Sequence, residues 1–151
     1  MMVVLYVQLM ANAFISLKRL PYNDLAWHVE ISASNGYFSG VQDFYTYPEN
    51  LDVLGADFYK FPQSIQDEVR FELGDRTGKW AHFVLVRAFI FDSVGHAAIE
   101  FAVDNNATSP NHAQTSFFIR TEVAAINNLG QQLRAWVVAH DAPLIWSSPA
   151  V

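Results

Sequence analysis

Five histidines are the residues of this chain best suited to acid–base or metal chemistry, since cysteine is absent. Metal sites commonly use pairs spaced as H-x-H, H-x-x-x-H or H-E-x-x-H. None of these spacings occurs, so we expect no metal site. The period-two pattern places His28 and His96 on outward strand faces, whereas His82 is expected to be a hydrogen-bonded histidine of the core. The five are His28, His82, His96, His112 and His140.

Motifs for nucleophilic or phosphate chemistry are also missing from the sequence. It contains no G-x-S-x-G elbow, no P-loop and no G-x-G-x-x-G turn. Asp92, Ser93 and His96 are residue types of a catalytic triad, but Asp and Ser are equally suited to turns. A triad is defined by its geometry and not by neighbourhood in sequence. We therefore expect no enzymatic activity, no catalytic residue and no cofactor.

The charge balance restricts the class of partner. Fifteen acidic residues against nine Lys and Arg give a net charge of −6, and the basic residues are scattered singly except for Lys18-Arg19. Binding of phosphates needs clustered Lys and Arg, so nucleic acid is not expected as a partner. A basic protein partner fits the charge. Hydrophobic residues reach 52% of the chain, so either the core is large or part of the surface is apolar and binds something.

The elements that must position a surface site follow from the hydrophobic periodicity. Residues 26–33 alternate apolar and polar, which predicts a half-buried strand. Asn35-Gly36 favours a two-residue type I′ turn, and Gly40 in the returning strand predicts a bulge. Two segments with apolar residues at helical spacing predict helices. The expected strands are 26–33, 37–47, 68–73, 80–91, 96–104 and 115–121, and the expected helices are 48–61 and 123–137.

Strands joined by hairpins, without alternating helices, predict an α+β fold. We expect an antiparallel meander of six or seven strands, with a short mid-chain helix and a long C-terminal helix packed on the sheet. The length of 151 residues suits one domain. The prediction is thus a single domain over residues 1–151, with apolar extensions at 1–10 and 141–151.

The N-terminal residues MMVVLYVQLMANAF combine an apolar run with Ala11-Asn12-Ala13, a pattern that a signal peptidase can cut. The run lacks a positively charged start, Gln8 interrupts it, and it is too short to span a bilayer. The alternatives are an N-terminal strand or residues upstream of a start at Met10. We expect a cytoplasmic protein with no membrane partner, and the apolar ends are candidates for a homodimer interface.

Acidic and aromatic side chains are predicted on the outer faces of the strands. Glu30, Glu72, Glu100 and Asp104 all point away from the apolar positions, so a shared sheet would have an acidic outer face. An acidic sheet face is ordinarily only a solvated surface. The more specific interpretation is a docking face for a basic protein. Aromatics of residues 37–47 form either a protein-binding patch or part of a second covering layer. The candidate partner-binding residues are Glu30, Asp43, Tyr45, Glu72, Glu100 and Asp104.

Four segments give the chain a resemblance to a known family. They are N-G-Y-F-S-G at 35–40, E-V-R-F-E-L-G at 68–74, G-H-A-A-I-E-F at 95–101 and L-G-Q-Q-L-R-A-W at 129–136. Over roughly residues 14 to 138 the chain resembles the WapI-type immunity proteins of bacterial polymorphic toxin systems. The resemblance implies a cytoplasmic, non-catalytic protein that binds and blocks a cognate toxin. The family offers no catalytic residues to carry over, and the apolar ends depart from its pattern.

Two other classes of function stay open at this point. One is a small-molecule-binding or enzymatic domain with a pocket between the sheet and the C-terminal helix. The other is an oligomeric structural domain that uses its apolar termini as the interface. A polar cavity would favour the first, and a solid core would count against it.

Overall fold

The computed structural model describes residues 13–21, 25–77 and 80–148. The predictions for residues 1–10, including the signal-peptide and N-terminal strand alternatives and the N-terminal half of the homodimer interface, lie outside the described residues. In the C-terminal extension at 141–151, residues Leu144–Ser148 form a strand. No helix of the described residues is both long and apolar enough to cross a membrane.

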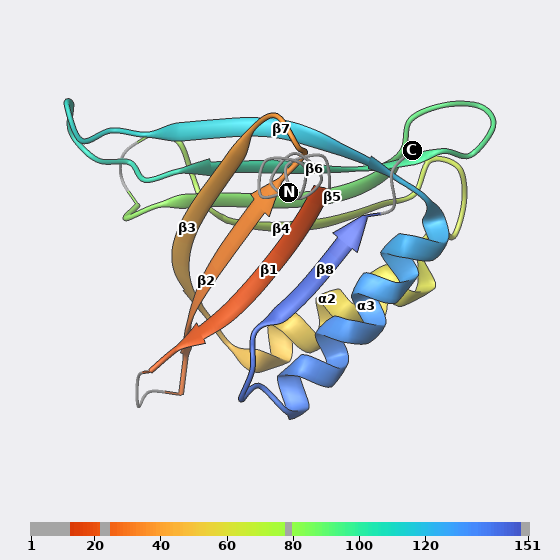
Figure 1. The fold of residues 1–151 in the computed structure, drawn as a ribbon, viewed down its shortest axis with the longest axis horizontal. Helices are drawn as coiled ribbons and strands as arrows, with labels where there is room; N and C mark the ends of the chain where they lie inside the picture. Colours follow the sequence, from red (N-terminus) through yellow and green to blue (C-terminus); the bar gives the residue numbers. More distant parts are fainter. Residues whose placement is uncertain (1–12, 22–24, 78–79, 149–151) are drawn as a thin grey trace, which may run out of the picture.

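The described strands form two antiparallel sheets of four strands each, and the two sheets lie face to face with their strands crossing (Figure 1). Sheet A has the order β3-β2-β1-β8, and sheet B has the order β4-β5-β6-β7. The elements of sheet A are β1 (Ala13–Leu20), β2 (Trp27–Ser34), β3 (Ser39–Thr46) and β8 (Leu144–Ser148). Those of sheet B are β4 (Glu68–Gly74), β5 (Phe83–Ile90), β6 (Ala97–Asp104) and β7 (Gln114–Thr121).

The described residues also form two helices, which lie side by side next to the sheets (Figure 1). They are α2 (Pro48–Lys60) and α3 (Val123–Val138). The α+β class, the mid-chain helix and the C-terminal helix packed on a sheet are therefore confirmed. The difference is that the hairpins divide between two sheets, since α2 carries the chain from β3 in sheet A to β4 in sheet B.

The main hydrophobic core of the described residues lies between the inner faces of the sheets and the two helices. Val29 and Phe44 from sheet A meet Ile99 and Phe101 from sheet B, and all four are at most 1% exposed. The face of α3 that points to this core contributes Ile126, Leu129, Leu133 and Trp136, all buried. These apolar side chains lie where the small-molecule alternative had placed its pocket.

The two helices touch through glycines. A Cβ on Gly130 would lie 2.5 Å from the carbonyl oxygen of Gly55 and 2.5 Å from the amide nitrogen of Tyr59. These distances are far below van der Waals contact, so only glycine permits the backbones to approach this closely. The apolar spacing in sequence predicted both helices, whereas this contact explains why each helix has a glycine in its interior.

The β2–β3 hairpin differs from its prediction in two ways. Residues 35–38 form a loop in place of a two-residue type I′ turn, and only Gly36 has a positive φ, of 93°. The Asn35 side-chain oxygen accepts hydrogen bonds from the amides of Tyr37 and Phe38, which stabilises the longer loop. The predicted bulge at Gly40 is absent, because the register runs without a break from Ser34 opposite Ser39 to Trp27 opposite Thr46.

Gly40 has a packing role instead. A Cβ at this position would lie 2.4 Å from the Thr115 Cγ2 atom and 3.3 Å from side-chain atoms of Phe101 and Val103. Sheet B therefore approaches β3 closely enough that a side chain is excluded.

Candidate protein-binding surface on sheet A

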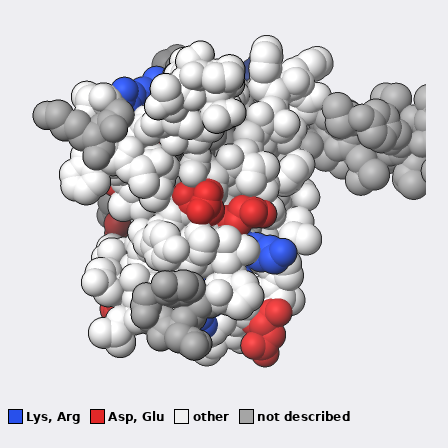
Figure 2. Space-filling view, turned by 90° about the vertical axis from the view of Figure 1, so that its left-hand side faces the viewer, with Lys and Arg blue, Asp and Glu red and all other residues white. Residues whose placement is uncertain are grey.

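Exposed aromatic residues line the edge strand β3 and its two ends. Tyr37 is 90% exposed and Phe38 64% in the hairpin loop, Val41 and Tyr45 are 60% and 48% exposed on the strand, and Tyr47 is 53% exposed where the strand meets α2. We call these five residues, together with His28, Glu30 and Asp43, the β3 surface. Figure 2 shows the side of the molecule that carries β3: most of it is uncharged, and acidic side chains gather near its middle.

The cross-strand register brings the polar residues of the β3 surface together. His28 lies opposite Tyr45, and Glu30 lies opposite Asp43. His28 and Tyr45 stack with ring centres 4.3 Å apart and planes 9° from parallel. The Nε2 atom of His28 is 2.8 Å from the Oδ2 atom of Asp43, so the imidazole donates to the carboxylate. This hydrogen bond is the main cause that lowers the pKa of Asp43 below its usual value.

A second histidine acts on the same carboxylate from sheet B. His82 directly precedes β5 and is half-buried, whereas a core position was predicted. Burial lowers the pKa of His82, and the negative charge of Asp43 works in the opposite direction. The hydrogen bond from His28 thus orients the Asp43 carboxylate and favours its ionised form.

The acidic residues predicted on sheet B lie in a different setting. Glu72 and Glu100 are on the outer face of sheet B, not on one sheet with Glu30. The Nε atom of Arg87 is 2.7 Å from Glu100, and an Nη atom of Arg70 is 2.8 Å from Glu72. These ion pairs neutralise the carboxylates locally, so the expectation of one acidic face shared by all four acids is wrong.

Asp104 has no surface to offer a partner, because it is only 4% exposed. Its Oδ1 atom accepts from the amide of Asn106 at 2.7 Å and is 2.9 Å from the Nε2 atom of His112. The side chain of Asn106 in turn donates to the carbonyls of Asp75 and Trp80. Asp104 therefore anchors the loop after β6, and that loop holds the β4–β5 loop.

The triad residue types at the β5–β6 turn have a local role. The Oδ1 atom of Asp92 accepts from the amides of Val94 and His96, and its Oδ2 atom contacts the His96 ring. The His96 hydrogen bond is the main cause that lowers the pKa of Asp92. Ser93 makes none of these contacts, and the arrangement is that of a side chain capping a turn. No group of three potential metal ligands occurs in the described part of the chain.

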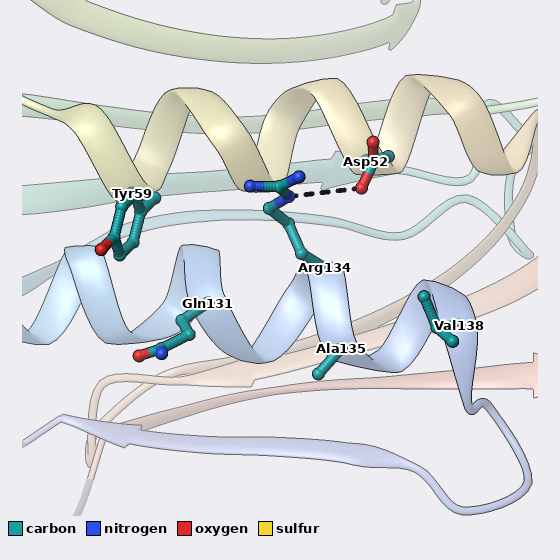
Figure 3. A pocket seen from close by; sticks show the side chains of 6 residues that line it. All are labelled: Asp52, Tyr59, Gln131, Arg134, Ala135 and Val138. Carbon is teal, nitrogen blue, oxygen red and sulfur yellow. Dashed lines mark hydrogen bonds and ion pairs between the residues drawn. The ribbon is translucent and has the colours of Figure 1, made fainter.

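One open cavity of about 490 Å³ lies between α2 and α3 (Figure 3). The Nε atom of Arg134 on α3 is 3.4 Å from the Oδ1 atom of Asp52 on α2, and this pair spans the cavity. The cavity is therefore formed by the helix pair and not by the sheet and α3, where the small-molecule alternative had placed its pocket. It is lined by Asp52, Tyr59, Gln131, Arg134, Ala135 and Val138.

Sequence reasoning found part of the β3 surface and missed the rest. It proposed Asp43 and Tyr45 as partner-binding candidates, and Tyr45 is indeed half-exposed, on the strand that forms an edge of sheet A. His28 was recognised only as an outward residue. The signal for its pairing was present, because a period of two places His28, Asp43 and Tyr45 on one face once the hairpin register is known.

Comparisons with known proteins found structures with a similar path of the chain, but no related sequence. No family model and no curated protein matches this sequence. The structure of WHY1 from Arabidopsis thaliana is similar, with 11% identity, a TM-score of 0.49, and coverage of 83% of this chain and 78% of that one. WHY3 from Arabidopsis thaliana has 10% identity, a TM-score of 0.47, and coverage of 83% and 81%. The plant transcriptional regulator PBF-2 has 8% identity, a TM-score of 0.45, and coverage of 85% and 79%.

The expectation that nucleic acid is not a partner is wrong as it was stated. It rested on basic residues that are scattered along the sequence, but Arg70 and Arg87 lie directly opposite each other, and Arg120 is on the same face of sheet B. Proteins of similar chain path include a transcriptional regulator. Scatter in sequence is no measure of scatter in space, so the exclusion is withdrawn. At these identities and TM-scores the likeness itself carries no argument about function.

Proposed function

We propose that this chain is a non-catalytic, cytoplasmic protein of the immunity type, which neutralises a cognate protein toxin by binding it through the β3 surface. The observation that carries the proposal is the row of exposed aromatic residues along β3 beside an ordered, ionised Asp43. The resemblance of four segments to WapI-type immunity proteins supports the class of partner.

The composition of the β3 surface is suited to a protein interface. Binding energy at interfaces concentrates in tyrosine, tryptophan and arginine anchors that become desolvated, within a rim of polar residues. Tyr37, Tyr45 and Tyr47 supply such anchors, and the stack of Tyr45 on His28 holds one of them in place before binding. Preorganised anchors lose less conformational entropy when the partner docks.

Electrostatics favours a basic partner at this surface. Glu30 and Asp43 lie opposite each other, and the whole chain carries a net charge of −6. A long-range negative field speeds the encounter with a positively charged protein, and a close basic side chain then pairs with the carboxylates.

The test is co-expression with the product of the gene next to the one that encodes this chain. The expected result is that the chain restores growth and co-purifies with that product, whereas Asp43→Lys and Tyr45→Ala reduce both. Asp57→Lys makes the same charge change on α2, where Asp57 is exposed, and is expected to leave rescue intact.

Two outcomes would overturn the proposal. One is that the unaltered chain neither rescues growth nor co-purifies. The other is that Asp57→Lys and Asp43→Lys act alike, which would mean that overall charge matters and the β3 surface does not. Titration of the same proteins with single- and double-stranded oligonucleotides adds a further outcome: tight binding there without rescue makes nucleic acid the partner instead.

A further inference from the structure

The free edges of the two sheets are not equally protected against pairing with another strand. Natural proteins shield sheet edges with charged side chains, short strands, bulges or covering segments. On β4, Arg70 forms ion pairs with Glu68 and Glu72, so this edge carries alternating charges. The edge strand β8 has only five residues and follows a proline. The Ser148 hydroxyl at its end lies 2.8 Å from Thr121, which brings β8 against the end of β7.

The edge strand β3 lacks these protections within the described residues. It has eight residues without proline or lysine, and its pairing with β2 continues through its whole length. Its one charged side chain, Asp43, is hydrogen-bonded to His28 on the neighbouring strand. A regular strand of this length at a sheet edge is a template for a further strand.

The hairpin geometry shows which backbone groups of β3 point outward. The amide of Asn35 donates to the carbonyl of Phe38 at 3.0 Å, so these two residues form a hydrogen-bonded pair. Such pairs alternate with non-bonded pairs along an antiparallel ladder. Ser39, Val41 and Asp43 therefore direct their N–H and C=O groups away from β2. In agreement, the Asp43 carbonyl accepts a hydrogen bond at 2.9 Å from the Gln42 side chain, not from a strand.

A groove runs beside the first half of β3. It has a volume of about 180 Å³ and lies between β3 and the facing ends of β6 and β7. Ser39, Val41 and Gln42 form one wall, and Val103 and Gln114 contribute to the other. An extended peptide in this groove would lie next to the outward N–H and C=O groups of Ser39 and Val41.

We propose that the partner contributes an extended segment that pairs with the free edge of β3 as a fifth strand of sheet A. This inference rests on the proposed function and names the kind of contact that the toxin makes. Side chains of neighbouring strands lie side by side, so alternate residues of the segment meet Val41, Asp43 and Tyr45 in turn. The segment therefore has an apolar residue, then a Lys or Arg, then an aromatic or apolar residue at alternate positions.

The first experiment uses a synthetic probe, the blocked heptapeptide Thr-Val-Thr-Lys-Thr-Tyr-Thr. Its binding is measured by fluorescence anisotropy, and the bound site is mapped by NMR shifts of backbone amides. The expected result is binding with shifts at Ser39, Val41 and Asp43. Two copies carry N-methyl groups on alternate amides, one in each phase, and at least one copy is expected to bind about tenfold more weakly because it loses backbone hydrogen bonds to β3.

The second experiment changes the strand itself. Val41→Pro removes an outward N–H without removing a bond to β2, a position at which edge strands tolerate proline. It is expected to weaken binding of the heptapeptide about tenfold. The matched variant Val41→Thr keeps the N–H and the β-branched shape and is expected to change binding by less than about threefold. Circular dichroism confirms that both variants are folded, and the N-methylated peptides keep the test valid if Val41→Pro is not.

Several results would overturn the inference. They are an absence of peptide binding, equal binding of both N-methylated copies and the parent, shifts that map away from β3, and self-association of the chain through β3. If Val41→Pro still rescues growth, the inference of strand addition is overturned and the proposed function stands. Peptide binding at β3 without growth rescue by the chain would overturn the proposed function and leave strand addition standing.

Discussion

The outer faces of the two sheets contain similar residues and have different electrostatic character. On sheet B, the register places Arg87 opposite Glu100, and the two side chains form an ion pair. On sheet A, Lys18 is opposite Glu30, but no ion pair joins them within the described residues. Asp43 interacts with His28 instead. The comparison teaches that the charge of a sheet face depends on which strands pair. A carboxylate on sheet B is held in an ion pair with arginine, whereas the carboxylates on sheet A are available to a partner.

The largest expected difference concerns two aspartates. Asp104→Ala on sheet B should lower the free energy of unfolding by about 2–4 kcal/mol, because it removes a buried carboxylate and leaves the Asn106 amide and His112 without their acceptor. Asp43→Ala on sheet A should cost less than about 1 kcal/mol, since that carboxylate is solvent-exposed. Urea denaturation of both variants measures the difference. Equal losses would contradict the division between the two faces.

The next largest effect concerns exposed aromatic residues. Tyr45→Ala should weaken partner binding by about 2 kcal/mol, or about thirtyfold, if Tyr45 is an anchor of the interface. Phe118→Ala on the outer face of sheet B removes a ring that is equally exposed, at 50%, and should leave affinity within about threefold. Isothermal titration calorimetry with the co-purified partner gives both values. A greater loss for Phe118→Ala would assign the interface to sheet B.

A smaller effect is expected for charge pairs. A double-mutant cycle on Arg87 and Glu100 should give a coupling energy of about 1 kcal/mol, because both side chains are mostly buried at 22% and 21% exposure. The matched cycle on Lys18 and Glu30 should give about 0.3 kcal/mol or less. Both come from thermal or urea unfolding of the single and double alanine variants. Coupling of similar size in both cycles would contradict the electrostatic difference between the two faces, since both pairs lie directly opposite each other in the register.

The smallest effect is a pH dependence of the His28–Asp43 pair. The pKa of Asp43 is lowered in the folded state, mainly by the hydrogen bond from His28. Asp43 therefore contributes stability above its ordinary pKa of 3.8, and this contribution is lost as the pH falls through the lower folded value. The unaltered chain should exceed Asp43→Asn in stability by about a few tenths of a kcal/mol at pH 6, with the difference disappearing once the pH has fallen below the folded pKa of Asp43. A gap that stays constant over that range would disprove the role of the pair.

The β2–β3 hairpin shows how far prediction from sequence reached. Alternation in residues 26–33 identified β2 and its outward residues, because each side chain alternates by the geometry of the strand alone. A two-residue turn at Asn35-Gly36 would have placed His28 opposite Asp43. The observed loop of residues 35–38 places His28 opposite Tyr45 and Asp43 opposite Glu30. The face of each residue was predictable, and its neighbour across the strands was not.

The glycines show the same limit. Gly40 was expected to mark a bulge, since glycine in a strand commonly does. Its actual reason is the approach of Thr115 from the other sheet, a contact between residues far apart in sequence. Likewise, the helical spacing of apolar residues predicted α2 and α3, but nothing in that spacing indicated that Gly55 and Gly130 touch.

The sequence by itself determined the α+β class, the helices and most strands, because hydrophobic period, turn residues and prolines act over a few neighbouring residues. Only the tertiary structure decided that the strands divide into two sheets, that β3 is an exposed edge, and that arginines neutralise the acids of sheet B. Those outcomes depend on strand pairing and packing between distant segments. A hydrogen-bond ladder or an ion pair forms wherever such segments meet, and no local pattern specifies where that is.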